Sequence, residues 1–249
     1  MADRRDHHEA ARIAEAAGRQ LLRLRAELAD RDVNPRELKD RGDRLSHQFI
    51  LEELAVAFPD DAVLSEEGAD DDARLAAPRV WIVDPLDGTR EFSEVPRTDW
   101  AIHVALVQSG SPTAGAVSLP AIGVTYATDP APPQPPRPPQ RLRVVVSRTR
   151  PPAEAIRIAE ALDAELVEMG SAGAKAMSIL RGDADIYPHS GGQYEWDSAA
   201  PVAVAAAAGL HVSRIDGSDL VYNRPDPYLP DLLICRPEHA EQVIEAARA

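Results

Sequence analysis

The sequence contains few cysteine, lysine and aromatic residues. Its 249 residues include one cysteine, Cys235, which excludes an internal disulfide and is typical of a reducing compartment. We therefore expect a cytoplasmic protein. Only two lysines, Lys39 and Lys175, occur among the 27 basic residues. Aromatic residues make up 4% of the chain, so aliphatic side chains and alanine must fill the core.

Long apolar runs and excess positive charge are absent as well. No stretch of 18 apolar residues occurs, and the charged start "MADRRDHHEA" has no apolar signal-peptide core, so we expect no membrane partner. The net charge is −14. A groove for a nucleic-acid polymer needs clustered Lys and Arg, so such a partner is not expected. An acidic protein can still bind a small anion if metal ions mediate the contact.

Apolar spacing predicts helices and strands in the first half of the chain. A single helical stripe runs over 6–29, and a second helix is predicted over 44–57. Short apolar strands are predicted over 62–65 and 80–84, with a polar loop at 69–78 between them. Three further strands, separated by turn residues, predict an antiparallel meander over 101–107, 114–119 and 123–128.

The second half alternates between strands and helices, which is typical of an α/β layer. Strands are predicted over 142–147, 165–169, 184–187 and 211–215, and helices over 151–162, 173–181 and 198–208. The segment "PAPPQPPRPP" (130–139) can be neither helix nor central strand. We therefore expect an α+β half over 1–140 and an α/β half over 141–249, joined by an exposed proline-rich connection.

The segment "WIVDPLDGT" (81–89) carries the clearest chemical signal. Asp84 ends an apolar strand, Pro85 stops that strand, and Asp87 begins a turn with Gly88 and Thr89. Backbone N–H groups at such a turn attract phosphate. Two carboxylates that converge around a turn repel each other unless a cation lies between them, and Mg²⁺ prefers carboxylate oxygens, water and phosphate as ligands.

Further carboxylates are predicted at the ends of other elements. Glu66 and Glu67 follow the strand in "VLSEEG", Asp43 is predicted at a helix start, and Asp197 begins an alanine-rich helix. Each has a purely structural alternative, because Asp43 and Asp197 could be helix N-caps and Glu66 could be a surface residue. Together they predict an acidic cleft that holds metal ions.

The motifs "WIVDPLDGTREF", "SEEG" and "EWDSAAPVAVAAAAG" together resemble the Mg²⁺-dependent, Li⁺-sensitive inositol monophosphatase superfamily. The resemblance implies the layered αβαβα sandwich of that fold. Within the superfamily, "DPLDGTREF" and "YPHSGGQYEWDSAAP" look most like CysQ-type enzymes. Glu91 stands where the inositol-phosphate enzymes more often have Asn, and His189 stands where related nucleotidases often have Arg.

The resemblance implies a role for each matching residue. Two Mg²⁺ ions, with a third at a weaker site, would be held by Glu66, Asp84, the carbonyl of Leu86, Asp87, Asp197 and, for the third ion, Asp43. Thr89 and Asp43 would orient the attacking water, with Glu67 as a further catalytic candidate. Substrate contacts would come from Asp87, Gly88, Thr89, Ser171, Lys175, His189 and Asp197.

The implied activity is hydrolysis of the 3′-phosphate of 3′-phosphoadenosine 5′-phosphate, and of its sulfated form, by a metal-activated water without a phosphoenzyme. The partner would be a phosphorylated small molecule, and a homodimer remains open. Two alternatives also remain open. One is an inositol or sugar monophosphatase with the same mechanism, and the other is a non-catalytic Mg²⁺ or nucleotide sensor on the same fold.

Overall fold

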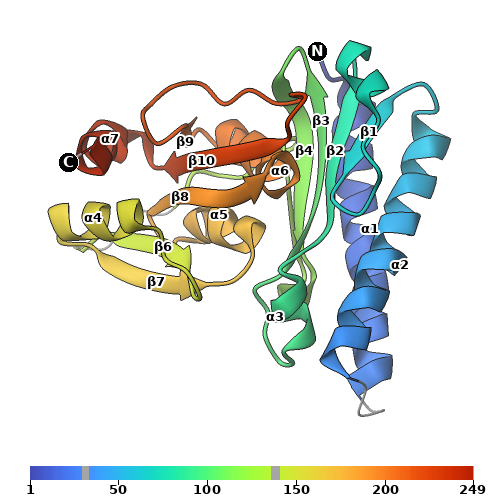
Figure 1. Cartoon of the computed structure of the whole chain (residues 1–249), viewed down its shortest axis with the longest axis horizontal. Helices are drawn as coiled ribbons and strands as arrows, with labels where there is room; N and C mark the ends of the chain where they lie inside the picture. Colours follow the sequence, from blue (N-terminus) through green and yellow to red (C-terminus); the bar gives the residue numbers. More distant parts are fainter. Residues whose placement is uncertain (30–33, 136–140, 249) are drawn as a thin grey trace.

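The computed structural model describes residues 1–29, 34–135 and 141–248 and contains two five-stranded sheets (Figure 1). The first sheet has the strand order β1-β2-β3-β4-β5, and the second has the order β7-β6-β8-β10-β9. Helices cover the outer faces of both sheets and fill the space between them. The predicted αβαβα layering is confirmed.

The first sheet is formed by residues 62–127. Its strands are β1 (Ala62–Ser65), β2 (Val80–Asp87), β3 (Ala101–Gln108), β4 (Ser111–Leu119) and β5 (Val124–Ala127). β1 pairs with β2 in parallel, and the other neighbours are antiparallel, so the predicted meander is confirmed. Every residue of β2 is buried, as expected for a strand covered on both faces.

Two long helices, α1 (Arg4–Ala29) and α2 (Pro35–Ala57), cover the outer face of the first sheet. The predicted stripe of α1 is buried against this sheet in a cluster that includes Trp81 and Val83 of β2. The prediction that the second helix begins at 44 was wrong. Asn34 accepts a hydrogen bond from the backbone N of Arg36, and Pro35 occupies the first helical position, so these two residues start the helix earlier.

The second sheet follows the proline-rich segment. Its strands are β6 (Arg143–Ser147), β7 (Glu165–Met169), β8 (Ile186–Tyr194), β9 (His211–Ser213) and β10 (Tyr228–Cys235). β6 runs parallel to β7 and β8, whereas β10 is antiparallel to both of its neighbours. α4 (Ala153–Ala161) and α7 (Ala240–Arg248) pack on the outer face through Ile158 and Val243.

The layer between the sheets consists of α5 (Ala172–Arg181) and α6 (Glu195–Ala207). Met177 and Val204 of these helices share one core cluster with Ile82 of the first sheet and Leu232 of the second. Shorter helices occur in the connections: α3 (Thr89–Ser93), η1 (Asp72–Ala76), η2 (Pro120–Ile122) and η3 (Pro237–His239). η1 lies within the segment that was predicted as a polar loop.

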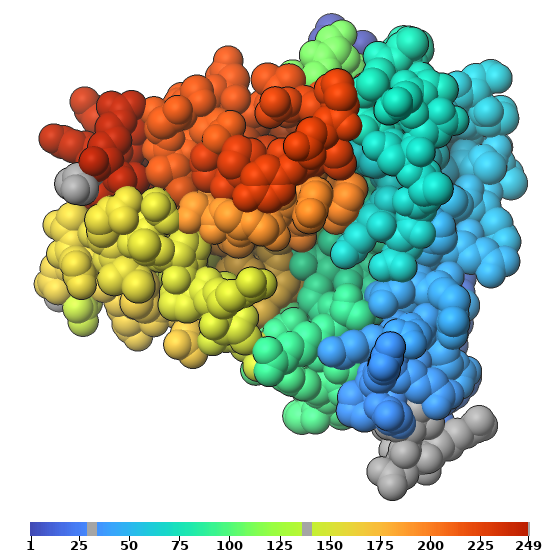
Figure 2. Space-filling view, viewed as in Figure 1, coloured from blue at the N-terminus to red at the C-terminus, as the bar shows by residue number. Residues whose placement is uncertain are grey.

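The two halves of the sequence are in close contact, as the blue-to-green and yellow-to-red surfaces in Figure 2 show. α6 of the second half packs on β2, β3 and β4 of the first. The boundary at residue 140 therefore stays a prediction, and residues 136–140 of the proline-rich segment lie outside the described residues. Residues 130–135 form neither helix nor strand, as predicted. None of the helices described has both the length and the apolar composition needed to cross a bilayer.

Candidate metal and phosphate site

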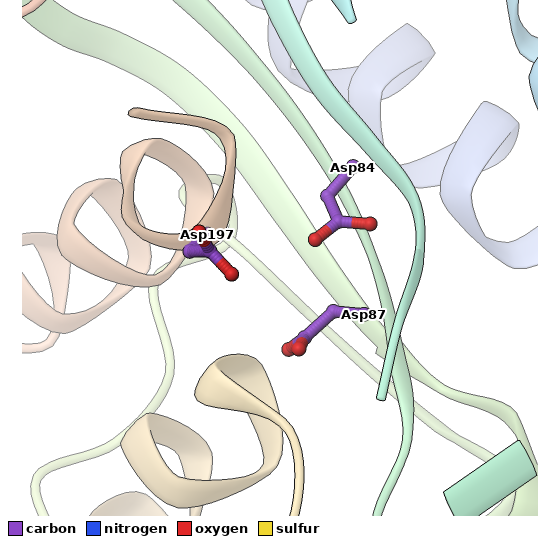
Figure 3. Close-up of side chains that lie close together, drawn as sticks. All are labelled: Asp84, Asp87 and Asp197. Atoms are coloured by element: carbon purple, nitrogen blue, oxygen red, sulfur yellow. The ribbon is translucent and has the colours of Figure 1, made fainter. Parts of the chain in front are cut away.

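Three carboxylates from the two halves of the chain meet in the interior. Asp84 and Asp87 come from β2, and Asp197 comes from the first turn of α6 (Figure 3). One carboxylate oxygen from each of the three lies within 4.8 Å of the other two. Asp84 and Asp87 are only 2% and 7% exposed. Sequence positions more than 100 residues apart thus form one acidic group.

An irregularity in β2 allows Asp84 and Asp87 to point to the same place. Residues three apart on a regular strand point to opposite faces. Against β3, however, Asp84 pairs with His103 and Asp87 pairs with Ala101, so β2 holds one extra residue between them. Such a bulge re-aims side chains. The backbone N of Leu86 also donates to Asp84 Oδ1 at 3.0 Å, which orients the first carboxylate.

Gly88 turns the chain after Asp87, with φ of +83° in the left-handed region. A Cβ at this position would lie 3.0 Å from the Cβ of Ser171 and 3.2 Å from the carbonyl oxygen of Asp99. Glycine is therefore favoured both by the backbone conformation and by the close approach of the turn before α5.

Asp87 is fixed by the N-terminus of α5. Its carboxylate accepts hydrogen bonds from Ser171 Oγ at 2.5 Å, from Ala172 N at 3.0 Å and from Gly173 N at 2.6 Å. His103 Nε2 lies 3.2 Å from Asp87 Oδ2. Burial opposes ionisation, but the bonds and charges of His103, Lys175 and Ser171 outweigh it and lower the pKa of Asp87 to about 2. Asp87 is therefore an anion at any ordinary pH.

The other two carboxylates resist ionisation. Burial, followed by repulsion from Glu66, Asp87 and Asp197, raises the pKa of Asp84 well above its ordinary value. Burial and the charge of Asp87 raise the pKa of Asp197 to about 7. Buried, mutually repelling carboxylates are the donor set that a hard divalent cation stabilises, so these residues fit a metal site.

Asp197 also stabilises the start of its own helix. Its Oδ2 accepts a hydrogen bond from the backbone N of Tyr194, the N-cap residue of α6, at 2.7 Å. The N-cap alternative for Asp197 is thus correct only in part, because Asp197 lies three residues inside the helix and forms the second half of a capping box. One carboxylate therefore serves both the helix and the acidic group.

Glu66 and Glu67 follow β1 at the rim of the site. The Glu66 residue as a whole is exposed, but its carboxyl interacts with that of Asp84. Desolvation of that carboxyl and the charges of Asp87, Glu67 and Asp43 outweigh the interaction with Asp84 and raise the pKa of Glu66 to about 7. Glu66 is thus exposed as a residue, while its carboxyl lies among the other acidic side chains of the site.

Asp43 reaches the site from the interior of α2, and the prediction that it begins a helix was wrong. Its carboxyl interacts with Thr89, and burial together with the charges of Glu67 and Asp40 raises its pKa to about 7. Thr89 Oγ1 donates to the carbonyl of Leu86 at 3.1 Å. The structure therefore brings Asp43, Thr89 and the Leu86 carbonyl together beside Asp84.

Lys175 and His189 lie on the side of the second half. Lys175 is buried, its Nζ donates to the carbonyl of Ser171 at 2.7 Å, and burial lowers its pKa against the opposing charges of Asp87 and Asp197. His189 Nε2 donates to the carbonyl of Gly191 at 2.9 Å. Burial and the charge of Lys175 lower the pKa of His189 to about 4, so His189 is neutral at neutral pH.

His103 is the residue that the sequence reasoning missed. It is fully buried, and its Nδ1 lies 3.0 Å from the carbonyl of Trp196 while its Nε2 faces Asp87. Contact with Asp87 outweighs burial and raises the pKa of His103, and both nitrogens face acceptors, which favours the charged ring. No sequence pattern marks this role, because it depends on the register between β2 and β3, in which His103 pairs with Asp84.

Known proteins resemble this chain in sequence and in fold. The sequence matches the model of the inositol monophosphatase family over residues 6–249. A 3′-phosphoadenosine 5′-phosphate phosphatase of Mycobacterium leprae is 50% identical over an alignment of 251 positions, which covers 96% of this chain and 92% of the relative. The 3′(2′),5′-bisphosphate nucleotidase CysQ of Escherichia coli is 34% identical over 200 residues, which cover 75% of this chain and 80% of the relative.

A solved structure shows the same fold. The crystal structure of CysQ from Bacteroides thetaiotaomicron, a bacterial member of the inositol monophosphatase family, superposes with a TM-score of 0.76 at 27% identity. The superposition covers 92% of this chain and 96% of that structure. The family match, the two relatives and the shared fold extend over most of the sequence. The chain belongs to the inositol monophosphatase family.

Proposed function

We propose that the chain is a metal-dependent 3′(2′),5′-bisphosphate nucleotidase that hydrolyses the 3′-phosphate of 3′-phosphoadenosine 5′-phosphate to give AMP. The observation that carries the chemistry is the group formed by Asp84, Asp87 and Asp197, whose oxygens lie within 4.8 Å of one another. The name of the Mycobacterium leprae relative at 50% identity supports the choice of substrate.

The carboxylates would hold two Mg²⁺ ions and, at a weaker site, a third. Asp84, Asp87 and Asp197 would hold one ion, Asp84 with Glu66 and the Leu86 carbonyl would hold a second, and Asp43 would contribute to the third. When bound, such cations offset the charge of the phosphate and lower the pKa of a coordinated water. The raised pKa values of Asp84, Asp197 and Glu66 support this assignment, because a cation relieves the repulsion among them.

Within this proposal, Thr89 and Asp43 orient the attacking water. The carboxyl of Asp43 interacts with Thr89 and has a pKa of about 7, so it can accept a proton near neutral pH. Glu67 acts on Asp43 only through its charge, which helps to keep that pKa high. Glu67 is therefore proposed as an electrostatic neighbour of the pair rather than as an acid or base.

A carboxylate nucleophile does not fit the contacts of Asp87. This side chain accepts three hydrogen bonds and contacts His103, so both of its oxygens are engaged and its orientation is fixed. Attack on phosphorus would require it to leave the N-terminus of α5. We therefore propose direct hydrolysis by water, without a phosphoenzyme.

The phosphate would lie over the turn formed by Asp87, Gly88 and Thr89, facing α5. Lys175, the one buried lysine near the carboxylates, offsets part of their charge from the second half of the chain. Ser171 fixes the turn before α5, and its carbonyl fixes Lys175. His189 lies beside Lys175 as a neutral side chain and would contact an uncharged part of the substrate.

A phosphate-release assay tests the activity. The substrates are 3′-phosphoadenosine 5′-phosphate, its sulfated form and inositol 1-phosphate, each with Mg²⁺, with EDTA and with Mg²⁺ plus Li⁺. We expect Mg²⁺-dependent release from the two nucleotides and inhibition by Li⁺. Release from inositol 1-phosphate alone would support the inositol phosphatase, and no release from any substrate would support the non-catalytic sensor.

The cellular location and the oligomeric state stay predictions. A cytoplasmic location rests on the single cysteine, and a homodimer is one of the possible oligomeric states. Sedimentation of the purified chain tests the second of these, since a monomer at micromolar concentration would contradict it.

A further inference from the structure

Residues 147–150 lie beside the turn that holds Asp87. They follow β6, and the parallel pairing of Ser147 with Met169 places them next to the end of β7. Gly170 and Ser171 follow β7 and lead into α5. The carboxyl ends of two neighbouring parallel strands thus bring Arg148 and Arg150 to the edge of the site.

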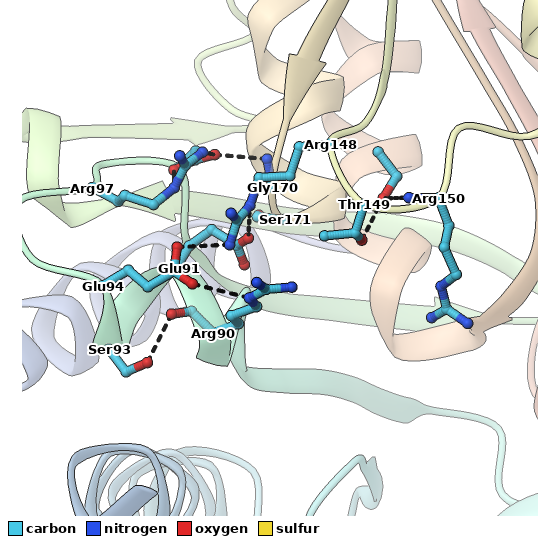
Figure 4. A network of polar contacts seen from close by, with 12 residues as sticks. Arg90, Glu91, Ser93, Glu94, Arg97, Arg148, Thr149, Arg150, Gly170 and Ser171 are labelled. Carbon is cyan, nitrogen blue, oxygen red and sulfur yellow. Dashed lines mark hydrogen bonds and ion pairs between the residues drawn. The ribbon is translucent and has the colours of Figure 1, made fainter. Parts of the chain in front are cut away.

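Glu91 of α3 holds Arg148 in place. Arg148 Nε donates to Glu91 Oε1 at 2.6 Å, and a terminal guanidinium nitrogen donates to Glu94 Oε2 at 2.8 Å (Figure 4). Glu91 is buried. A Cβ on Gly170 would lie 2.3 Å from the carboxyl carbon of Glu91, so the Glu91 side chain packs directly on the turn before α5. The first half of the chain therefore orients the segment after β6.

Arg150 differs from the arginines around it. Arg90, Arg97 and Arg148 each pair with a carboxylate. Within residues 1–29, 34–135 and 141–248, the guanidinium of Arg150 makes no hydrogen bond or ion pair, and Figure 4 shows its side chain extending away from the Glu91–Arg148 pair. Its backbone N–H, by contrast, donates to Ser147 Oγ at 3.4 Å.

Arg150 and Lys175 both lie near His189. The charges of both residues lower the pKa of this ring. The charges of Asp87 and Asp197 in turn oppose the effect of burial on the pKa of Lys175. Lys175 Nζ lies 5.5 Å from the centroid of the Tyr187 ring, and the Tyr187 and His189 rings are 6.2 Å apart. Positive groups thus extend from the carboxylates through Lys175 toward Arg150, in a chain whose net charge is −14.

We propose that Arg150, together with Lys175, binds a second anionic group of the substrate, and that the Glu91–Arg148 pair positions Arg150 to do so. This inference rests on the proposed function, and it assigns the residues that bind the second phosphate of the substrate. For 3′-phosphoadenosine 5′-phosphate that group is the 5′-phosphate. A free guanidinium is suited to it because its planar donors bind two phosphate oxygens at once. Arg150 is then a specificity-determining residue, and Glu91 is a positioning residue.

The first test compares two substrates. Adenosine 3′-phosphate lacks the 5′-phosphate but presents the same bond for hydrolysis. For Arg150→Ala we expect kcat/KM for the bisphosphate to fall about tenfold to a hundredfold, as for a lost hydrogen bond to a charged group. The value for the monophosphate should stay within about twofold, and Arg150→Lys should recover part of the loss. Arg4→Ala, which removes an exposed arginine at the start of α1, is the control and should change neither substrate.

The second test concerns positioning. Glu91→Gln and Arg148→Ala should each lower kcat/KM for the bisphosphate by about threefold to tenfold, and the double variant should lose no more than the worse single variant, because both act through one contact. The monophosphate is the decisive comparison. An equal loss with both substrates would mean that the pair is merely structural and would overturn its positioning role.

A binding measurement separates this inference from the proposed function. With EDTA present, the carboxylates repel phosphate, so tighter binding of adenosine 5′-phosphate than of adenosine reports on the cationic groups alone. Calorimetry should show this preference in the wild type and its loss in Arg150→Ala. The same preference in both proteins would overturn the role of Arg150 even if the bisphosphate is hydrolysed. Loss of the preference would support the role even if hydrolysis fails.

Discussion

Replacing Asp197 by Asn should stabilise the metal-free protein and abolish its activity. Asp197 is held close to Asp84 and Asp87, and burial and the Asp87 charge raise its pKa to about 7. The neutral amide removes this repulsion. Asn also keeps a side-chain oxygen that can accept the hydrogen bond from Tyr194 N, so the start of α6 should not be disturbed.

The size of the effect follows from the pKa. A rise from 3.8 to about 7 corresponds to about 4 kcal/mol, at about 1.4 kcal/mol for each pKa unit. Because the folded carboxyl binds its proton more tightly than the unfolded one, the stability of the wild type falls as pH rises from about 4 to about 7. Neighbouring carboxyls can take up protons in its place, so we expect a net gain for Asp197→Asn of about 2 to 4 kcal/mol above pH 7.

Urea unfolding with EDTA at pH 8 and at pH 5 measures this gain. We expect Asp197→Asn to be more stable than the wild type at pH 8, with a smaller difference at pH 5. Saturating Mg²⁺ should stabilise the wild type more than the variant, because a ligand that binds only the folded state adds its binding free energy to stability. Asp219→Asn removes an exposed carboxylate and is the matched control. A variant that is less stable than the wild type with EDTA at pH 8 would refute the reasoning.

Three further outcomes follow from the site. Asp84→Asn should reduce turnover at saturating Mg²⁺ by at least about a thousandfold in a phosphate-release assay, because it removes a ligand shared by two proposed ions. Mg²⁺ affinity should rise with pH up to about 7, and binding at pH 6 should release protons in calorimetry, because the carboxyls of Glu66 and Asp197 have pKa values of about 7 and must ionise to bind metal. Gly173→Ala should cost about 1 to 3 kcal/mol in urea unfolding, because its Cβ would lie 2.1 Å from His103 Nε2.

A specific result would contradict each of these three predictions. Near-normal turnover of Asp84→Asn would remove this residue from the metal site. A Mg²⁺ affinity that is equal at pH 6 and pH 8 would mean that the carboxyls are already ionised without metal. For the glycine, Gly68→Ala is the control, since its Cβ would meet nothing closer than 3.5 Å and should change stability by less than about 0.5 kcal/mol. Equal stability of the two glycine variants would contradict the predicted clash.

The sequence predicted most of the elements because their patterns are local. The stripe of α1 and the apolar run of β2 follow directly from side-chain periodicity. β10 and α7 were not predicted. β10 (Tyr228–Cys235) contains Pro230 and Asp231, which interrupt a strand pattern, and its pairing with β8 shifts register at that point. Only its pairing with β8 and β9 shows that this segment lies inside a sheet.

The site was predictable where a motif carries its own geometry. Asp84, Asp87 and Gly88 lie in one short segment, and the turn that they form is local. Asp43 was misplaced, because the helix start depends on Asn34 and Pro35 rather than on the first apolar residues. The role of His103 depends on the register between β2 and β3, and that of Arg148 depends on a contact with Glu91 across the two halves. Neither contact leaves a pattern in the sequence.

The group of Asp84, Asp87 and Asp197 forms only when the two sheets pack together, because Asp87 is hydrogen-bonded to α5 and Asp197 belongs to α6. A fragment that ends near residue 140 would keep Asp84 and Asp87 but would lose Asp197 and every backbone donor of α5. Such a fragment should not retain tight cation binding, even if its own sheet folds. The affinity for Mg²⁺ is therefore a direct measure of whether the two parts of this polypeptide are packed together.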